Sequence, residues 1–191
     1  GLWQHELVLP ASFHLHVNIS PVHFRGAALV AFVTEALRRW EVPPTSVVLE
    51  ITESELMQDE PEIIQTLHDL RAEGVGLAID DFGTGYCSIS CQRLPVDMVK
   101  IDRALVTGVD TDPQQRRLAA AVVQLIEAVQ LTPIVDGVET AAEAAQLQAL
   151  GCRFAQGPHF SAPLPAKEMT DRLRGRRALR SSAAQPDTIS G

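Results

Sequence analysis

The sequence predicts an α/β fold of the TIM-type (β/α) barrel class, and two observations support this prediction. Six segments with the pattern of a β-strand alternate with segments of helical spacing, which is typical of a mostly parallel sheet. Polar side chains also fall at the C-terminal ends of different predicted strands. In a barrel these ends converge on one site, whereas an open sheet would spread them in a row. We therefore favour a barrel, incomplete here because six units are too few to close eight strands.

The first four elements alternate between strand and helix. Residues 13–20 alternate apolar and polar side chains and are predicted to form a strand. Residues 27–40 have apolar side chains at helical spacing, and residues 46–52 form a β-branched strand. A second helix opens near Pro61 and ends at Gly74.

The remaining elements continue the same alternation. In order, they are a strand over 76–79, a short helix to about Arg93, a strand over 96–102, a helix over 113–130, a strand over 132–138, a helix from the capping box at Thr140 to Gly151, a weak strand over 152–157 and a helix over 166–174. In the long helix we expect the apolar side chains, Leu118 and Leu125 among them, to face the core. Residues 175–191 are polar and small, and we predict a disordered tail there.

Two adjacent carboxylates, Asp80 and Asp81, follow the third predicted strand. At the end of a buried strand they repel each other and lose solvation, so they must be protonated, hydrogen-bonded or neutralised by a cation. The other strand ends offer oxygen ligands and no histidine or cysteine. This donor set suits Mg²⁺ or Mn²⁺.

Four carboxylates and one amide exceed what a single magnesium ion usually takes from a protein, so we predict two divalent cations. Asp80 is the natural bridge between them. Asn18 and Glu50 would lie on one side of this bridge. Asp81 and Asp136 would lie on the other side.

The chemistry that such a site predicts is metal-dependent phosphodiester hydrolysis. Two ions can activate a water and stabilise both the attacking and the leaving oxygen of an in-line displacement. Lys100 ends the fourth predicted strand amid these acids. Its ammonium is placed to orient the water or to offset charge on the phosphate.

Composition excludes several other classes. The net charge of −8 argues against a nucleic-acid polymer as partner, and no apolar run approaches the length of a membrane span. The three cysteines lack the spacing of a zinc site or a disulfide framework, so we expect a reducing, cytoplasmic compartment. The first methionine is Met57. We therefore expect a piece of a longer protein, either cytoplasmic or the cytoplasmic portion of a membrane-attached one.

The motifs VNIS, LEITES, DDFGTGY, LPVDMVKID, GVET and AQG, in this order and spacing, resemble the EAL domain. The resemblance runs from about residue 13 to residue 165. It implies a modified TIM barrel that linearises cyclic di-GMP (c-di-GMP) to pGpG in bacterial second-messenger signalling. We expect residues 1–174 to form this domain without its first strand.

The resemblance also assigns roles residue by residue. It implies that the metal ligands are Asn18, Glu50, Asp80, Asp81 and Asp136. It implies that the catalytic residues are Lys100, which activates the water, and Glu139, and that the substrate contacts are Gln156 and Asp102. The residues that support the DFGTG loop would be Glu53, Thr84 and Gly85. The family uses that loop in dimer contacts, so a homodimer is expected. A sensory or GGDEF domain upstream is common in such proteins.

Two departures from the family pattern keep an alternative open. The family's Glu-Ala-Leu segment, which supplies a strand and a further metal ligand, should lie upstream of the strand over 13–20, and it is not found there; the Glu-Ala-Leu at residues 35–37 falls in a predicted helix instead. Asp136 stands where the family usually has glutamate, a ligand longer by one methylene. The alternative is a degenerate EAL domain that acts as a non-catalytic c-di-GMP sensor or a protein-interaction module. A weaker third option is a different metal phosphohydrolase on the same barrel.

Overall fold

The computed structural model describes residues 13–20, 23, 28–56, 61–83 and 94–183. Within them the strands form a six-stranded sheet in which every neighbouring pair is parallel. The strands are β1 (Leu15–Asn18), β2 (Val47–Thr52), β3 (Gly76–Phe82), β4 (Met98–Ile101), β5 (Thr132–Val135) and β6 (Phe154–Ala155). The predicted strands are confirmed, although β1, β4, β5 and β6 are shorter than expected and β3 is longer.

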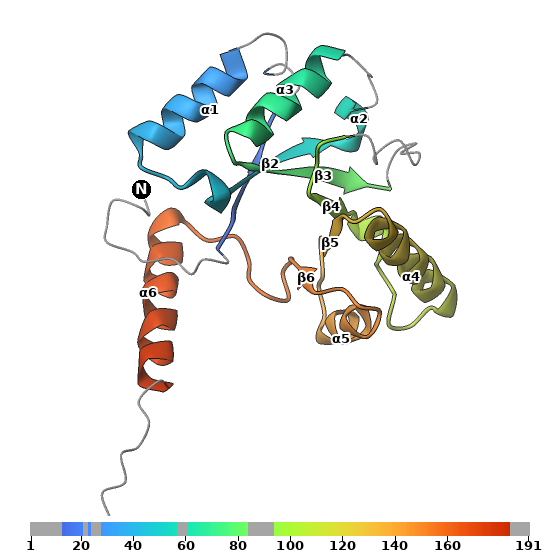
Figure 1. Cartoon of the computed structure of the whole chain (residues 1–191). Helices are drawn as coiled ribbons and strands as arrows, with labels where there is room; N and C mark the ends of the chain where they lie inside the picture. Colours follow the sequence, from blue (N-terminus) through green and yellow to red (C-terminus); the bar gives the residue numbers. More distant parts are fainter. Residues whose placement is uncertain (1–12, 21–22, 24–27, 57–60, 84–93, 184–191) are drawn as a thin grey trace, which may run out of the picture.

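The order of the strands in space follows their order in the sequence, from β1 to β6. A doubly wound sheet would reverse its order at a switch point, whereas a barrel does not. Figure 1 shows the sheet curling, with helices outside the curve. The structure is therefore a parallel half-barrel, which confirms the prediction of an incomplete TIM-type barrel.

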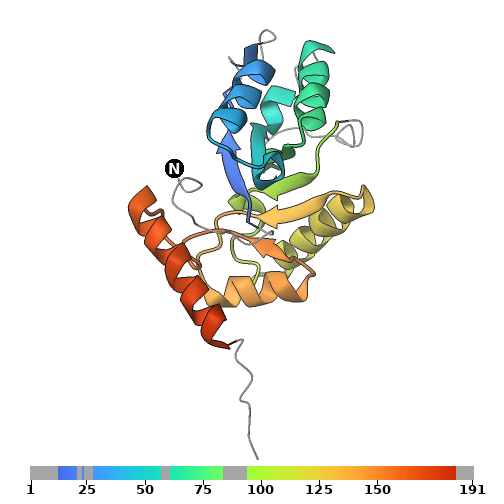
Figure 2. The ribbon, with the colours of Figure 1, turned by 60° about the vertical axis from the view of Figure 1, so that its left-hand side comes forward.

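The helices that connect successive strands cover the outer face of the sheet, and the last helix follows β6. They are α1 (Ala28–Arg39), α2 (Glu53–Leu56), α3 (Pro61–Ala72), α4 (Pro113–Ala128), α5 (Ala141–Ala149) and α6 (Ala166–Ala183), with short 3-10 turns η3 (Pro44–Ser46) and η5 (Arg103–Leu105). Helices α1 and α3 contact each other, and α6 stands apart from them in both views (Figures 1 and 2). Across the described ranges, no helix combines the length and the apolar character needed to cross a bilayer.

The core lies between the outer face of the sheet and these helices. Successive side chains of a strand point to opposite faces. Leu49 and Ile51 of β2 are buried in one cluster with Leu67 of α3. Residues at the alternate positions, such as Glu50, therefore face the inside of the half-barrel, where the polar side chains gather.

Two predictions about the helices need correction. Leu118 and Leu125 of α4 are each 45% exposed, because only the stripe with Val123 and Ile126 faces the sheet. Helix α6 continues to Ala183 rather than ending at residue 174. Elongating an existing helix through alanine, leucine and arginine costs little once the first turn has formed.

Two other predictions concern segments outside the described residues. The short helix expected to end near Arg93 falls in the range 84–93, and the last part of the expected tail is 184–191. A disordered tail stays a prediction for 184–191 alone.

The start of α5 has the capping box that the sequence predicted. The Thr140 hydroxyl accepts a hydrogen bond from the backbone N–H of Glu143 at 3.1 Å. The Glu143 carboxylate accepts hydrogen bonds from the backbone N–H groups of Glu139 and Thr140, at 3.0 and 3.1 Å. This pattern satisfies donors that the helix itself leaves unpaired and fixes the loop between β5 and α5.

We expect Glu143→Ala to lower the free energy of unfolding by about 1 kcal/mol at pH 7, the usual cost of a lost helix cap. Burial raises the pKa of Glu143, but the backbone hydrogen bonds outweigh burial and hold the pKa below its ordinary 4.5. A carboxylate with a lowered folded pKa stabilises the fold above its unfolded pKa, and this stabilisation is lost as the pH falls through the folded pKa.

Urea unfolding at pH 7 and at pH 3 measures this effect. The gap in stability between wild type and Glu143→Ala is expected to shrink at pH 3. The exposed Glu73, replaced by alanine, serves as the control. An equal gap at both pH values would contradict the assignment.

Candidate active site

Charged side chains converge on the inside of the half-barrel, toward the C-terminal ends of its strands. Glu50 of β2, Asp80 of β3 and Lys100 of β4 are buried at positions that alternate with the apolar core residues. Asp136 directly follows β5 and is half-buried. Four neighbouring strands thus bring their charges together, as the sequence predicted, because a curled parallel sheet draws these ends to one side.

The Lys100 ammonium lies at the centre of this cluster. Its Nζ is 2.9 Å from Glu50 Oε2 and 2.9 Å from Asp80 Oδ1. Asp136 Oδ2 is farther away, at 3.6 Å. One cation therefore contacts three carboxylates, and a negative charge remains in excess.

The local electrostatics keep both Lys100 and Glu50 ionised. Burial lowers the pKa of Lys100, but its contacts with Glu50 and Asp80 outweigh burial and raise the pKa above its ordinary 10.5. Burial raises the pKa of Glu50, yet hydrogen bonds from His16 and Lys100 bring it below 4.5. Each group is thus held in its charged form by the other.

An irregularity in β3 separates the two adjacent aspartates. The register with β4 shifts between Ile79 and Phe82, and Asp81 has a φ of 55°, in the left-handed region. As a result Asp80 points into the cluster and is buried, while Asp81 is exposed. The pKa of Asp81 is raised, first by desolvation and then by the neighbouring charges of Asp80 and Asp102. This excess of negative charge favours a bound cation.

The edge strand β1 contributes Asn18 and His16. Asn18 is the in-register partner of Glu50, so both side chains leave the same face of the sheet. Sequence reasoning treated the histidines as scattered and missed His16. Its Nδ1 lies 2.7 Å from Glu50 Oε1. The available signal was its position, two residues before Asn18 and therefore on the same face.

Glu53 supports the loop that follows β3. It is buried, and its Oε2 accepts the backbone N–H of Gly83 at 2.9 Å. Its Oε1 is buried, with no hydrogen-bond partner among the residues that the structure describes. The contact lies at the start of the loop that Glu53 is expected to support. Thr84 and Gly85, predicted for the same loop, lie outside the described residues.

Three other predicted residues lie around the cluster rather than in it. Glu139 is exposed and forms an ion pair with Arg103, at 2.6 Å. The Asp102 carboxylate accepts the backbone N–H of Ala104 at 2.8 Å and caps η5. Gln156 lines a cavity of about 1190 Å³ on the open side of the half-barrel, and His16 lines it too.

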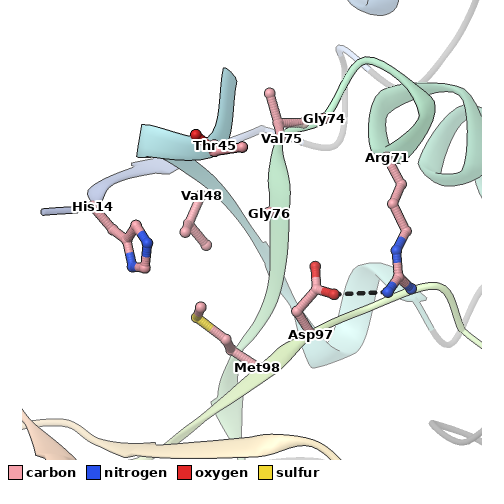
Figure 3. Close-up of a pocket in the computed structure, with 9 residues that line it drawn as sticks. All are labelled: His14, Thr45, Val48, Arg71, Gly74, Val75, Gly76, Asp97 and Met98. Atoms are coloured by element: carbon pink, nitrogen blue, oxygen red, sulfur yellow. Dashed lines mark ion pairs between the residues drawn. The ribbon is translucent and has the colours of Figure 1, made fainter. Parts of the chain in front are cut away.

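The opposite end of the strands is built differently. A smaller cavity of about 300 Å³ there is lined by His14, Val48 and Met98, and by Arg71 and Asp97 (Figure 3). Arg71 pairs with Asp97 at 2.9 Å, and the other oxygen of Asp97 accepts the backbone N–H of Leu77 at 3.1 Å. These contacts satisfy the local charges internally, so this end serves stability.

The donor set of the cluster fits divalent cations. Carboxylate oxygens from Glu50, Asp80, Asp81 and Asp136 suit Mg²⁺ or Mn²⁺, and Lys100 already occupies the position of a cation among three of them. In the described part of the chain, no three His, Cys, Asp or Glu side chains are arranged to hold one ion. An ion bound to these oxygens would compete for them with the ammonium of Lys100.

Buried acids and a lysine lie at the C-terminal ends of the strands of a parallel half-barrel, the end at which barrel enzymes carry their active sites. The family model of the EAL domain matches residues 2–163, and the chain belongs to this family. The oxygen sensor protein DosP of Escherichia coli is 38% identical over 81% of this chain and 20% of its own length. The cyclic di-GMP phosphodiesterase RocR of Pseudomonas aeruginosa is 35% identical over 85% of this chain and 42% of its own length. The chain thus spans less than half the length of these relatives.

Solved EAL structures share the fold. The EAL domain of Mycobacterium smegmatis DcpA has a TM-score of 0.80 at 39% identity, covering 85% of this chain and 73% of that one. The PaMucR phosphodiesterase in complex with c-di-GMP has a TM-score of 0.77 at 38% identity, covering 83% and 65%. Klebsiella pneumoniae BlrP1 with manganese and c-di-GMP has a TM-score of 0.73 at 31% identity, covering 82% and 40%.

We expect Lys100→Met to destabilise the protein in EDTA by on the order of 3–5 kcal/mol, because it leaves buried carboxylates without their cation. Mn²⁺ should then raise the melting temperature of the variant more than that of wild type, since no ammonium competes for the same oxygens. Thermal unfolding with EDTA and with Mn²⁺ measures both effects.

Lys167→Met is the matched control, because Lys167 is exposed and pairs with Asp171, at 3.0 Å on the surface of α6. Such a pair contributes about 0–1 kcal/mol. Similar losses of stability in the two lysine variants would contradict the role of Lys100 as the internal cation.

Proposed function

We propose that this domain hydrolyses c-di-GMP to linear pGpG with the help of two divalent cations, Mg²⁺ or Mn²⁺. The observation that carries the proposal is the convergence of Glu50, Asp80 and Asp136 on one buried position now filled by Lys100. Membership of the EAL family and the c-di-GMP phosphodiesterases among its relatives support the choice of substrate.

The ligands we propose are Asn18, Glu50, Asp80, Asp81 and Asp136. When bound, the ions would lower the pKa of a water and stabilise the attacking and leaving oxygens. In the reaction the water oxygen forms a bond to phosphorus while the bond from phosphorus to one ribose oxygen breaks. The water loses one proton as it attacks, and the ribose oxygen takes up one proton as it leaves, so this oxygen becomes a hydroxyl and one water is consumed.

Lys100 serves this reaction as a hydrogen-bond donor. Its raised pKa keeps it as an ammonium, which has no lone pair to take the proton of the water. Once displaced from the carboxylates, it donates to the attacking water or to a phosphate oxygen that gains charge. We propose Glu139 as the second catalytic residue, with Arg103 holding its carboxylate near the mouth.

We also propose contacts with the substrate and partners for this domain, on the basis of its EAL family and the position of the site. We propose that Gln156 contacts a guanine from the wall of the larger cavity, and that Asp102 contacts the substrate beside Lys100. We propose a homodimer, which the exposed Leu118 and Leu125 of α4 support as a candidate contact surface. A further sensory or GGDEF domain in the full-length protein, and a cytoplasmic location, complete the proposal.

A second candidate function is a non-catalytic c-di-GMP sensor or interaction module. Asp136 favours it, because this carboxylate is the most exposed and most distant of the three around Lys100, at 3.6 Å. A ligand shorter than glutamate by one methylene reaches less far into the site. The open side of the half-barrel favours it as well.

The test is incubation of the chain with c-di-GMP and Mg²⁺ or Mn²⁺, followed by chromatography of the products. We expect pGpG to form, and we expect Asp80→Asn to abolish its formation because the proposed bridging ligand is lost. Asp69→Asn, on the exposed face of α3, is the control and should keep the activity of wild type.

The outcomes separate the two candidates. Turnover that disappears only in Asp80→Asn supports the enzyme. Binding of c-di-GMP by calorimetry without turnover would overturn the enzyme in favour of the sensor. A chain that neither binds nor hydrolyses c-di-GMP would overturn both.

A further inference from the structure

We propose that His16 is a positioning residue that orients the Glu50 carboxylate, so that Glu50 binds a divalent cation through Oε2 alone. This inference rests on the proposed function, because it concerns the same metal site. It assigns a role to a side chain that the sequence patterns left without one.

The contact between His16 and Glu50 is short and largely shielded from water. His16 Nδ1 lies 2.7 Å from Glu50 Oε1, and the side chains are 26% and 4% exposed. An ionised carboxylate only accepts hydrogen bonds, so the Nδ1 atom carries the hydrogen and donates it. Charge-assisted hydrogen bonds of this kind are among the stronger ones in proteins.

The register of the sheet explains why His16 can make this contact. His16 is the Cα partner of Val48, one level below Glu50, while Asn18 is the partner of Glu50 itself. The imidazole therefore reaches diagonally across the inner face to Glu50. Asn18, and not His16, lies directly beside Glu50 on the neighbouring strand. His16 can hold Glu50 without taking the place of the proposed ligand.

The two oxygens of Glu50 have different partners. Oε1 accepts from His16, and Oε2 accepts from Lys100 at 2.9 Å. Lys100 is the cation that an incoming metal ion would replace, because it also contacts Asp80 and Asp136. The ion would then meet Oε2, while His16 retains Oε1 and prevents bidentate ligation.

A hydrogen bond to a ligating carboxylate restricts its orientation and so raises the affinity for the metal. Without His16, Oε1 would be a buried acceptor with no donor, and the carboxylate could rotate between several orientations. If the contact served the fold alone, its loss would lower the stability of the protein but would leave the affinity of the folded protein for the metal unchanged. Metal affinity is therefore the decisive measurement.

The experiment is calorimetric titration of Mn²⁺ into wild type, His16→Ala, His16→Asn and His14→Ala. The side-chain amide of asparagine places a donor near the position of Nδ1, so His16→Asn should restore the contact. His14 precedes β1 and lines the cavity at the far end of the strands (Figure 3); it also lines the larger cavity with His16, so His14→Ala tests whether any histidine there would have the same effect. Circular dichroism confirms that each variant is folded.

We expect His16→Ala to bind Mn²⁺ about 10–100-fold more weakly than wild type. His16→Asn should recover most of that loss, and His14→Ala should bind like wild type. Equal affinity of wild type and His16→Ala would overturn the role of His16 alone. So would an equal loss in His14→Ala, or a failure of His16→Asn to recover affinity. A wild-type domain that binds no Mn²⁺ would overturn the metal site of the proposed function, and the role of His16 with it.

Discussion

The structure depends on one buried ammonium group. Lys100 sits among Glu50, Asp80 and Asp136, and removing its charge would leave carboxylates in a medium that solvates them poorly. These four residues come from four neighbouring strands, so the cluster can form only when β2 to β5 are paired in the observed register. The fold and the site therefore stabilise each other, and neither is complete without the other.

The division of the sheet into two faces makes this arrangement possible. The outer face is apolar and packs against α1, α3, α4 and α5, which accounts for most of the hydrophobic stabilisation. The inner face carries the charges. The irregularity in β3 adds one adjustment, since it buries Asp80 beside Lys100 and leaves Asp81 at the surface with a positive φ. Two adjacent residues thus acquire different environments.

The same cluster is the basis of the proposed catalysis. Lys100 stabilises the carboxylates, and in the proposed function an incoming ion would compete with it for their oxygens. His16 would keep Glu50 oriented during this exchange by holding Oε1. In the structure the ammonium and the imidazole together hold the Glu50 carboxylate from both of its oxygens.

The sequence by itself determined the fold class, the strands and the residues of the central cluster. Alternating periodicities identified the βα units, and the positions of Glu50, Asp80, Lys100 and Asp136 at strand ends placed them on one side, because both features depend on local pattern alone. Only the tertiary structure decided which side chains touch. The contact between His16 and Glu50, the exposure of Leu118 and the pairing of Glu139 with Arg103 depend on register, curvature and packing between segments distant in the chain. No local pattern specifies those distances.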